Sequence, residues 1–138
     1  MLWRKALIYW RSCLVIGAII YVSLLREPSV ALPPIEDIDK YLHGLMYLLL
    51  TVVLLWDSKA VFGCRFGAEK CCLQSYKWWL IVLVFPIVLG GFIEILQEKF
   101  FYPRTGDWLD WLADCVGVLM GVGLWIIGQK CYERRMAQ

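Results

Sequence analysis

The sequence contains little charge and a single histidine. Only 19% of its 138 residues are charged whereas 61% are hydrophobic, and a water-soluble core cannot accommodate so large an apolar fraction. The chain also lacks a His-Glu-x-x-His pair, a Cys-x-x-Cys pair and a nucleophile motif, which argues against catalysis through any of these motifs. No metal-ligand spacing and no cofactor is indicated.

Four long apolar stretches, each bounded by charge, make up most of the chain. A helix needs about 20 such residues to cross a bilayer, and the second stretch is shorter unless Asp39, Lys40 and Asp57 snorkel or lie at the interface. Tryptophans fall near the ends of the stretches, as expected at the headgroup level. The sequence predicts one all-α domain over residues 1–138, a bundle of four transmembrane helices. The spans are expected at about residues 6–25, 41–56, 78–97 and 108–127.

Nearly all the unusual polar residues fall on one side of this predicted bundle, its outer face. They open the second span, close the third and lead into the fourth, and their spacings of three and four place them on shared helix faces. These faces should turn toward each other, away from lipid. The predicted cluster contains Asp39, Lys40, His43, Tyr47, Glu94, Gln97, Arg104, Asp110 and Asp114.

Two of these acids need an explanation because of their depth. A charge at the bilayer centre costs on the order of 3 kcal/mol or more. Glu94 and Asp114 lie about a turn or more inside the span boundaries, so each should be paired, hydrogen-bonded or protonated. Arg104 is the favoured cation because its planar fork suits a carboxylate, and we expect it to contact Glu94, Asp110 or Asp114.

Some polar residues have simpler structural explanations. Asp107 and Asp110 fit an acidic cap at the start of the fourth helix, and a lone histidine such as His43 is more often a hydrogen-bonded interior residue than a ligand. Glu94 and Gln97, one turn apart near a span end, are harder to explain by packing. We therefore interpret this pair as functional.

Small residues predict where the helices approach one another. Pro86 with Gly90 and Gly91 favours a kink or a close helix contact just before Glu94. Gly117 and Gly121 have the four-residue spacing that allows helix backbones to pack closely.

The order Asp39-Lys40, His43, Tyr47, Glu94-x-x-Gln97, Arg104, Asp110, Gly117 and Gly121 resembles that of the VanZ-like membrane proteins, a family named for a member associated with teicoplanin resistance. The resemblance covers about residues 39–121 in order, spacing and helix placement. One position departs from the family pattern, because Asp114 stands where members usually carry asparagine. The resemblance implies a multi-spanning cell-envelope protein of the bacterial cytoplasmic membrane, some members of which lower susceptibility to glycopeptide antibiotics.

Three functions are compatible with these features. The outer polar site could bind the headgroup of a membrane lipid or lipid-linked cell-wall component, and so alter glycopeptide access. The protein could instead be a membrane-embedded enzyme modifying a lipid or lipid-linked envelope precursor, with Glu94 or Asp114 as base and His43 as acid or metal ligand. The third possibility is a purely structural assembly factor, in which the charged residues only fix the packing of the helices.

The charge of the cluster narrows the ligand chemistry. Two cations, Lys40 and Arg104, face five acids including Asp107, which leaves a formal excess of three negative charges. This excess favours an amine-bearing or zwitterionic headgroup, a sugar or a divalent cation over a bare polyphosphate. Neither the ligand nor an oligomeric state follows from the sequence.

The distribution of basic residues predicts the orientation. Under a four-span topology, ten of the 14 Lys and Arg residues lie at the termini and in the middle loop, and loops rich in Lys and Arg stay in the cytoplasm. Cysteine accessibility or reporter fusions should therefore place both termini in the cytoplasm. An external C-terminus would contradict this topology. The same distribution explains the basic residues without a nucleic-acid partner.

Overall fold

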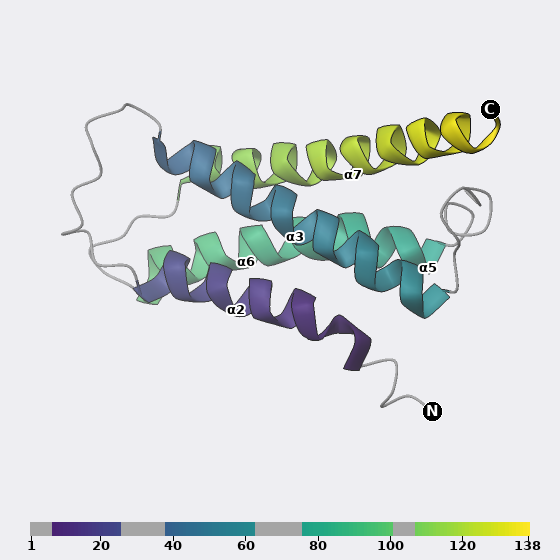
Figure 1. Ribbon diagram of the computed structural model, residues 1–138. Helices are drawn as coiled ribbons and strands as arrows, with labels where there is room; N and C mark the ends of the chain where they lie inside the picture. Colours follow the sequence, from purple (N-terminus) through teal and green to yellow (C-terminus); the bar gives the residue numbers. More distant parts are fainter. Residues whose placement is uncertain (1–6, 26–37, 63–75, 101–106) are drawn as a thin grey trace.

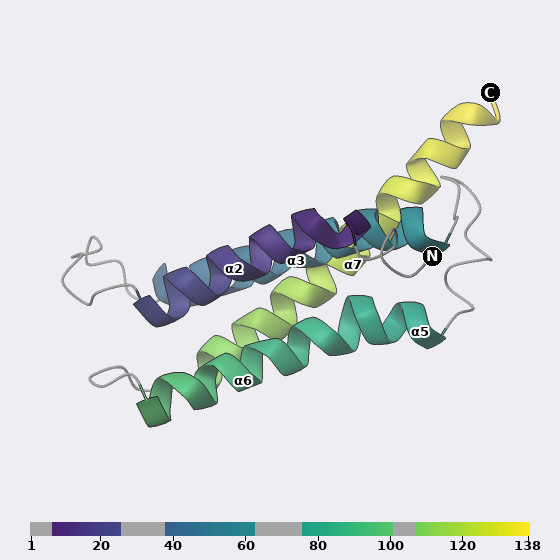
Figure 2. The ribbon, with the colours of Figure 1, turned by 90° about the horizontal axis from the view of Figure 1, so that it is seen from below.

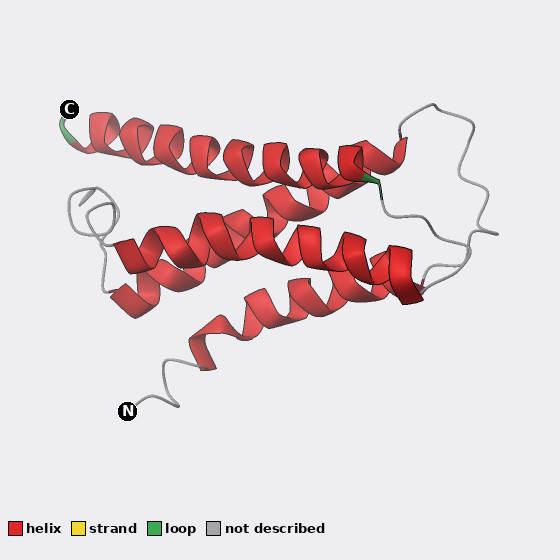
Figure 3. Cartoon of the chain, turned by 180° about the vertical axis from the view of Figure 1, so that it is seen from behind, coloured by secondary structure: helices red, strands yellow, loops and turns green. Residues whose placement is uncertain are grey.

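The structure, a computed structural model, describes residues 7–25, 38–62, 76–100 and 107–138, and almost all of them are helical (Figure 1). The elements in chain order are the 3-10 turn η1 (Leu7–Tyr9), α2 (Trp10–Leu25), α3 (Ile38–Phe62), α5 (Tyr76–Trp79), the π-helical turn η2 (Leu80–Val84), α6 (Phe85–Phe100) and α7 (Trp108–Met136). These ranges contain no strand (Figure 3). The predicted all-α fold is confirmed.

Four helical segments are long and apolar enough to cross a membrane, so the protein is a multi-pass membrane protein with four candidate spans. The second is longer than predicted: the 25 residues of α3 extend about 38 Å at 1.5 Å per residue, more than the roughly 30 Å of a bilayer core. Figures 1 and 2 show the beginning of α2 and the end of α7 at the same end of the bundle. We call this the inner end and the opposite one the outer end.

The closest helix packing joins α3 to α7. A Cβ atom added at Gly117 would collide with the backbone carbonyl of Gly44, and one at Gly121 would lie 2.9 Å from Thr51 Cβ. Thr51 turns its hydroxyl back to the Tyr47 carbonyl, at 2.8 Å, so its polar atom is satisfied inside the interface. The predicted close packing at Gly117 and Gly121 is confirmed, and Gly44 is the partner that makes it so tight.

The third span is irregular just before Pro86. There the Phe85 N–H donates to the carbonyl of Leu80, five residues earlier. A wider turn relieves the clash that a proline ring makes with the preceding helical turn. The glycines that follow give α7 close access to α6, since a Cβ at Gly90 would lie 2.6 Å from Asp114 Oδ2 and one at Gly91 3.2 Å from Trp111 Nε1. The predicted close contact is confirmed.

The first span is fixed to α3 by a buried acid near the inner end. Asp57 has no exposed surface; its Oδ1 accepts from Arg11 Nε at 3.0 Å and its Oδ2 from Ser12 Oγ at 2.8 Å. Partners on α2 thus satisfy Asp57 inside the protein, and its expected position at the membrane interface stays a prediction. Trp78, in the first turn of the third span, is buried beside Leu55.

We expect Gly117→Ala to lower the free energy of unfolding by about 1–3 kcal/mol, the usual cost of overpacking. Gly123→Ala on the same helix is the matched control, since a Cβ there meets nothing within 4 Å. It should be neutral or stabilising by up to about 1 kcal/mol. Denaturant titration of the purified protein measures both. Equal effects would contradict the close α3–α7 packing.

Arg11→Gln and Asp57→Asn break the same ion pair but should differ in cost. The Arg11 side chain is 43% exposed and that of Asp57 is not exposed at all. Losing Arg11 leaves a buried charge, which costs about 3 kcal/mol or more, whereas losing the charge of Asp57 leaves an arginine that water can reach, at about 1–2 kcal/mol. Denaturant titration tests whether Arg11→Gln lowers the free energy of unfolding more than Asp57→Asn does. A larger loss in Asp57→Asn would contradict this prediction.

Candidate functional site

Three buried ionisable side chains from three helices meet near the outer end. His43 lies in the second turn of α3, Asp114 in the second turn of α7, and Glu94 within the last two turns of α6. Their exposed fractions are 4%, 1% and 8%. The predicted convergence of the polar helix faces is thus confirmed for these three residues, which we call the His43 centre.

The imidazole of His43 lies between the two carboxylates. Its Nδ1 donates to Asp114 Oδ1 at 3.1 Å and lies 4.0 Å from Glu94 Oε1. Asp114 is therefore hydrogen-bonded, as its depth requires. A carboxylate bound to one ring nitrogen fixes the orientation of an imidazole, so Asp114 holds His43 with its Nδ1 directed into the centre.

Glu94 is only half satisfied. Its Oε2 accepts from the backbone N–H of Asp107 at 3.0 Å, at the N-terminus of α7, where the helix dipole stabilises negative charge. Its Oε1 is buried and has no hydrogen-bond partner among the residues that the structure describes. Buried polar atoms are normally paired, so this oxygen is available to a donor from a ligand or to the predicted contact with Arg104.

The predicted acidic arrangement at the start of α7 is confirmed. Asp107 is the N-cap of α7, and its Oδ1 accepts from the Leu109 N–H at 2.9 Å. Asp110 lies in the first turn of α7 and also belongs to a second group with Asp39 and His43, whose candidate ligand atoms lie within 4.8 Å of one another. The acids leading into α7 therefore have separate roles.

Two further residues, Gly90 and Tyr47, complete the surroundings of the His43 centre. Gly90 leaves room for Asp114, whose Oδ2 a Cβ atom there would approach to 2.6 Å. Tyr47, one turn below His43, is 1% exposed and interacts electrostatically with Asp114 and Glu94. Its hydroxyl also has no hydrogen-bond partner within the described ranges. A second unsatisfied polar atom thus lies near the same carboxylates.

The other predicted site residues are placed differently. Gln97 is 5% exposed, but its Nε2 donates to the Ser23 carbonyl at 2.8 Å, so it joins α6 to α2. Asp39 is exposed at the start of α3. Arg104 lies outside the described residues, and its contact with an acid stays a prediction.

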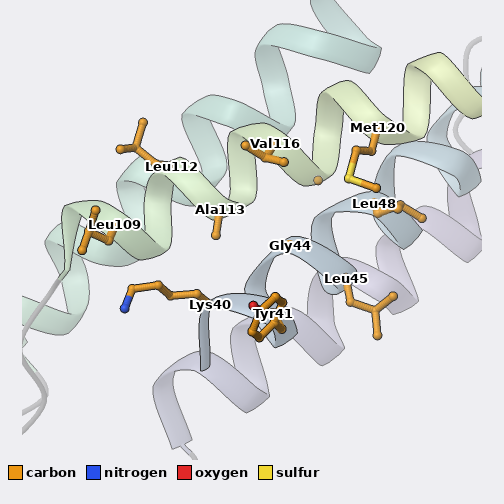
Figure 4. Close-up of a pocket in the computed structure, with 11 residues that line it drawn as sticks. Lys40, Tyr41, Gly44, Leu45, Leu48, Leu109, Leu112, Ala113, Val116 and Met120 are labelled. Carbon is orange, nitrogen blue, oxygen red and sulfur yellow. The ribbon is translucent and has the colours of Figure 1, made fainter. Parts of the chain in front are cut away.

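A largely apolar groove runs along α3 and α7 beside the centre (Figure 4). Its volume is about 600 Å³, within the roughly 300–1,000 Å³ typical of sites for small organic ligands. Lys40 and Leu109 lie toward the end of the groove near the helix starts, and Met120 lies farther along (Figure 4). Gly44 and Ala113, which line it, are sequence neighbours of His43 and Asp114, so groove and centre adjoin the same helix contact.

Sequence reasoning missed two contributors to this site. Gly44 sets the α3–α7 approach, and its only signal is a small residue directly after His43. The Asp107 backbone N–H, which binds Glu94, has no signal in side-chain identity at all. Both contribute through backbone atoms, which sequence patterns describe poorly.

Chemically, the centre can accept hydrogen bonds from a cationic or hydroxyl-bearing ligand, exchange protons through His43, or coordinate a cation. Compared with known protein families, curated proteins and solved structures, the chain shows no significant match to any of them. The geometry of the centre is therefore the basis on which its function is interpreted.

Proposed function

We propose that this protein is a VanZ-like cell-envelope protein that binds the headgroup of a membrane lipid or lipid-linked cell-wall component at the His43 centre. By occupying that component, it lowers susceptibility to glycopeptide antibiotics of the teicoplanin type. The observation that carries the proposal is Glu94 Oε1, a buried oxygen without a hydrogen-bond partner in the described part of the chain. A purely structural acid is expected to use both oxygens.

The ligand chemistry follows from the donors that the centre lacks. Glu94 and Asp114 offer acceptor oxygens, and His43 already directs its Nδ1 to Asp114. An ammonium or hydroxyl group of a headgroup would supply the missing donor to Glu94 Oε1. Charge-assisted hydrogen bonds of this kind are roughly twice as strong as neutral ones, so an amine-bearing headgroup fits best.

The groove between α3 and α7 supports a lipid-borne ligand. Except for Lys40 and the Tyr41 hydroxyl, its side chains are apolar, so it suits an acyl chain. Lys40 stands at the end of the groove where a headgroup would lie (Figure 4), and its ammonium complements a phosphate. A zwitterionic lipid would thus meet the carboxylates with its amine and Lys40 with its phosphate.

A second candidate is a membrane-embedded enzyme that modifies a lipid or lipid-linked envelope precursor. The hydrogen bond between Asp114 and His43 favours it, because a carboxylate-oriented imidazole is a common general acid or base. In that case His43 transfers a proton and Glu94 binds the substrate. Turnover of a lipid substrate, lost in His43→Gln, distinguishes this candidate from binding alone.

Glu94→Gln should abolish protection against teicoplanin while the protein still accumulates in the membrane, since the change keeps the size of the side chain and removes its charge. Arg104→Ala should act in the same way. The matched control is Glu133→Gln, near the opposite end of α7, which should protect as well as wild type. Inhibitory concentrations in an expressing strain, with membrane abundance measured alongside, test this.

Lipid analysis of the purified variants provides the molecular readout. Wild type and Glu133→Gln should retain the same lipid, and Glu94→Gln should lose it. If Glu94→Gln accumulates normally, protects cells and retains the lipid, the acid is only part of the helix packing and the proposed function is wrong.

A further inference from the structure

We infer that His43, Glu94 and Asp114 form a binding site for one divalent transition-metal ion. Each residue offers one ligand atom, and the three atoms lie within 4.8 Å of one another in a fully buried group. The unpartnered Glu94 Oε1 is one of the oxygens available to this ion. The cluster therefore combines converging ligands with a buried atom that lacks a partner.

The distances fit a single ion. Zinc bonds of about 2.0–2.2 Å to imidazole and carboxylate in a tetrahedral arrangement separate the ligand atoms by about 3.4 Å. His43 Nδ1 lies 3.1 Å from Asp114 Oδ1 and 4.0 Å from Glu94 Oε1, one separation slightly below this value and one slightly above. Shifts of a few tenths of an ångström, within the reach of side-chain rotation, would bring both to coordination geometry. The ion would replace the proton that Nδ1 shares with Asp114, and that proton would leave to solvent, because a ligating imidazole nitrogen is unprotonated.

The ligand types select the class of metal. Imidazole suits zinc, copper, iron and nickel, whereas calcium and magnesium prefer oxygen ligands alone. Imidazole and carboxylate are both ligands that zinc accepts, and three protein ligands leave the fourth tetrahedral position open for water or substrate. A divalent ion would also neutralise two carboxylates that lie together in a buried place, where unpaired charge is costly.

A small cavity leads to the same carboxylate. It has a volume of about 30 Å³ and lies between α6 and α7, where Glu94, Glu98 and Asp107 contribute polar atoms to its lining. A space of roughly 10–15 Å³ already accommodates one water molecule, so this cavity has room for a water molecule or an ion that has lost most of its hydration shell. Three acids along it favour a cation.

The test uses the purified full-length protein with its thiols alkylated and metals removed by chelation. Titration with Zn²⁺ should give one ion per chain. Asp114→Asn and Glu94→Gln should each weaken binding by at least about 100-fold, beyond the 10–100-fold typical of outer-shell partners. Glu133→Gln, at the far end of α7, is the control and should bind as wild type does.

Titration of the wild type with Co²⁺ keeps the inference testable if a variant fails to fold. Visible absorption typical of tetrahedral nitrogen and oxygen ligation is expected. Absence of stoichiometric Zn²⁺ binding, binding that both variants retain, or an octahedral Co²⁺ spectrum would overturn the site. Because no lipid is added, failure here leaves the headgroup proposal standing. Stoichiometric Zn²⁺ binding by the wild type, together with full protection and full lipid retention in Glu94→Gln, would instead overturn the headgroup proposal and leave the metal site standing.

Discussion

The close approach of α3 and α7 is the constraint on which the rest of the structure depends. Gly117 packs against the backbone of Gly44 with no room for a side chain. His43 directly precedes Gly44, and Asp114 lies one turn before Gly117, so the backbone contact sets the distance between the imidazole and the carboxylate. In a bilayer, helix association relies on such van der Waals packing because lipid tails are as apolar as the side chains. The same contact thus provides stability and positions the His43 centre.

Polar interactions are concentrated toward the two ends of the bundle, with an apolar core between them. The Arg11–Asp57 pair joins α2 to α3 near the inner end, and the His43 centre joins α3, α6 and α7 near the outer end. Side chains such as Leu50 and Ile93 fill the space between. Directional bonds near both ends fix the register of the helices, which apolar packing alone specifies weakly.

The two polar groups differ in how completely they are satisfied, and this difference separates structure from function. Both oxygens of Asp57 accept hydrogen bonds, from Arg11 and Ser12, so the inner acid needs nothing further. Glu94 keeps one buried oxygen without a partner in the part of the chain that the structure describes. Since leaving a buried acceptor unpaired costs free energy, the outer group is the one that gains from a ligand. Both the headgroup and the metal proposals follow from this asymmetry.

The sequence by itself determined the number of spans and predicted which acids lie too deep to be solvated. The length of an apolar stretch and the position of an acid along it are properties of a single helix. It also predicted that the polar residues gather at one end of the bundle, since successive membrane-spanning helices bring alternate loops to the same side. Only the tertiary structure decided that His43 pairs with Asp114, that Gln97 turns to α2, and that Asp57 is buried. Those choices depend on the rotation of each helix about its axis, which is set by backbone contacts such as Gly44 with Gly117 that no single-helix pattern contains.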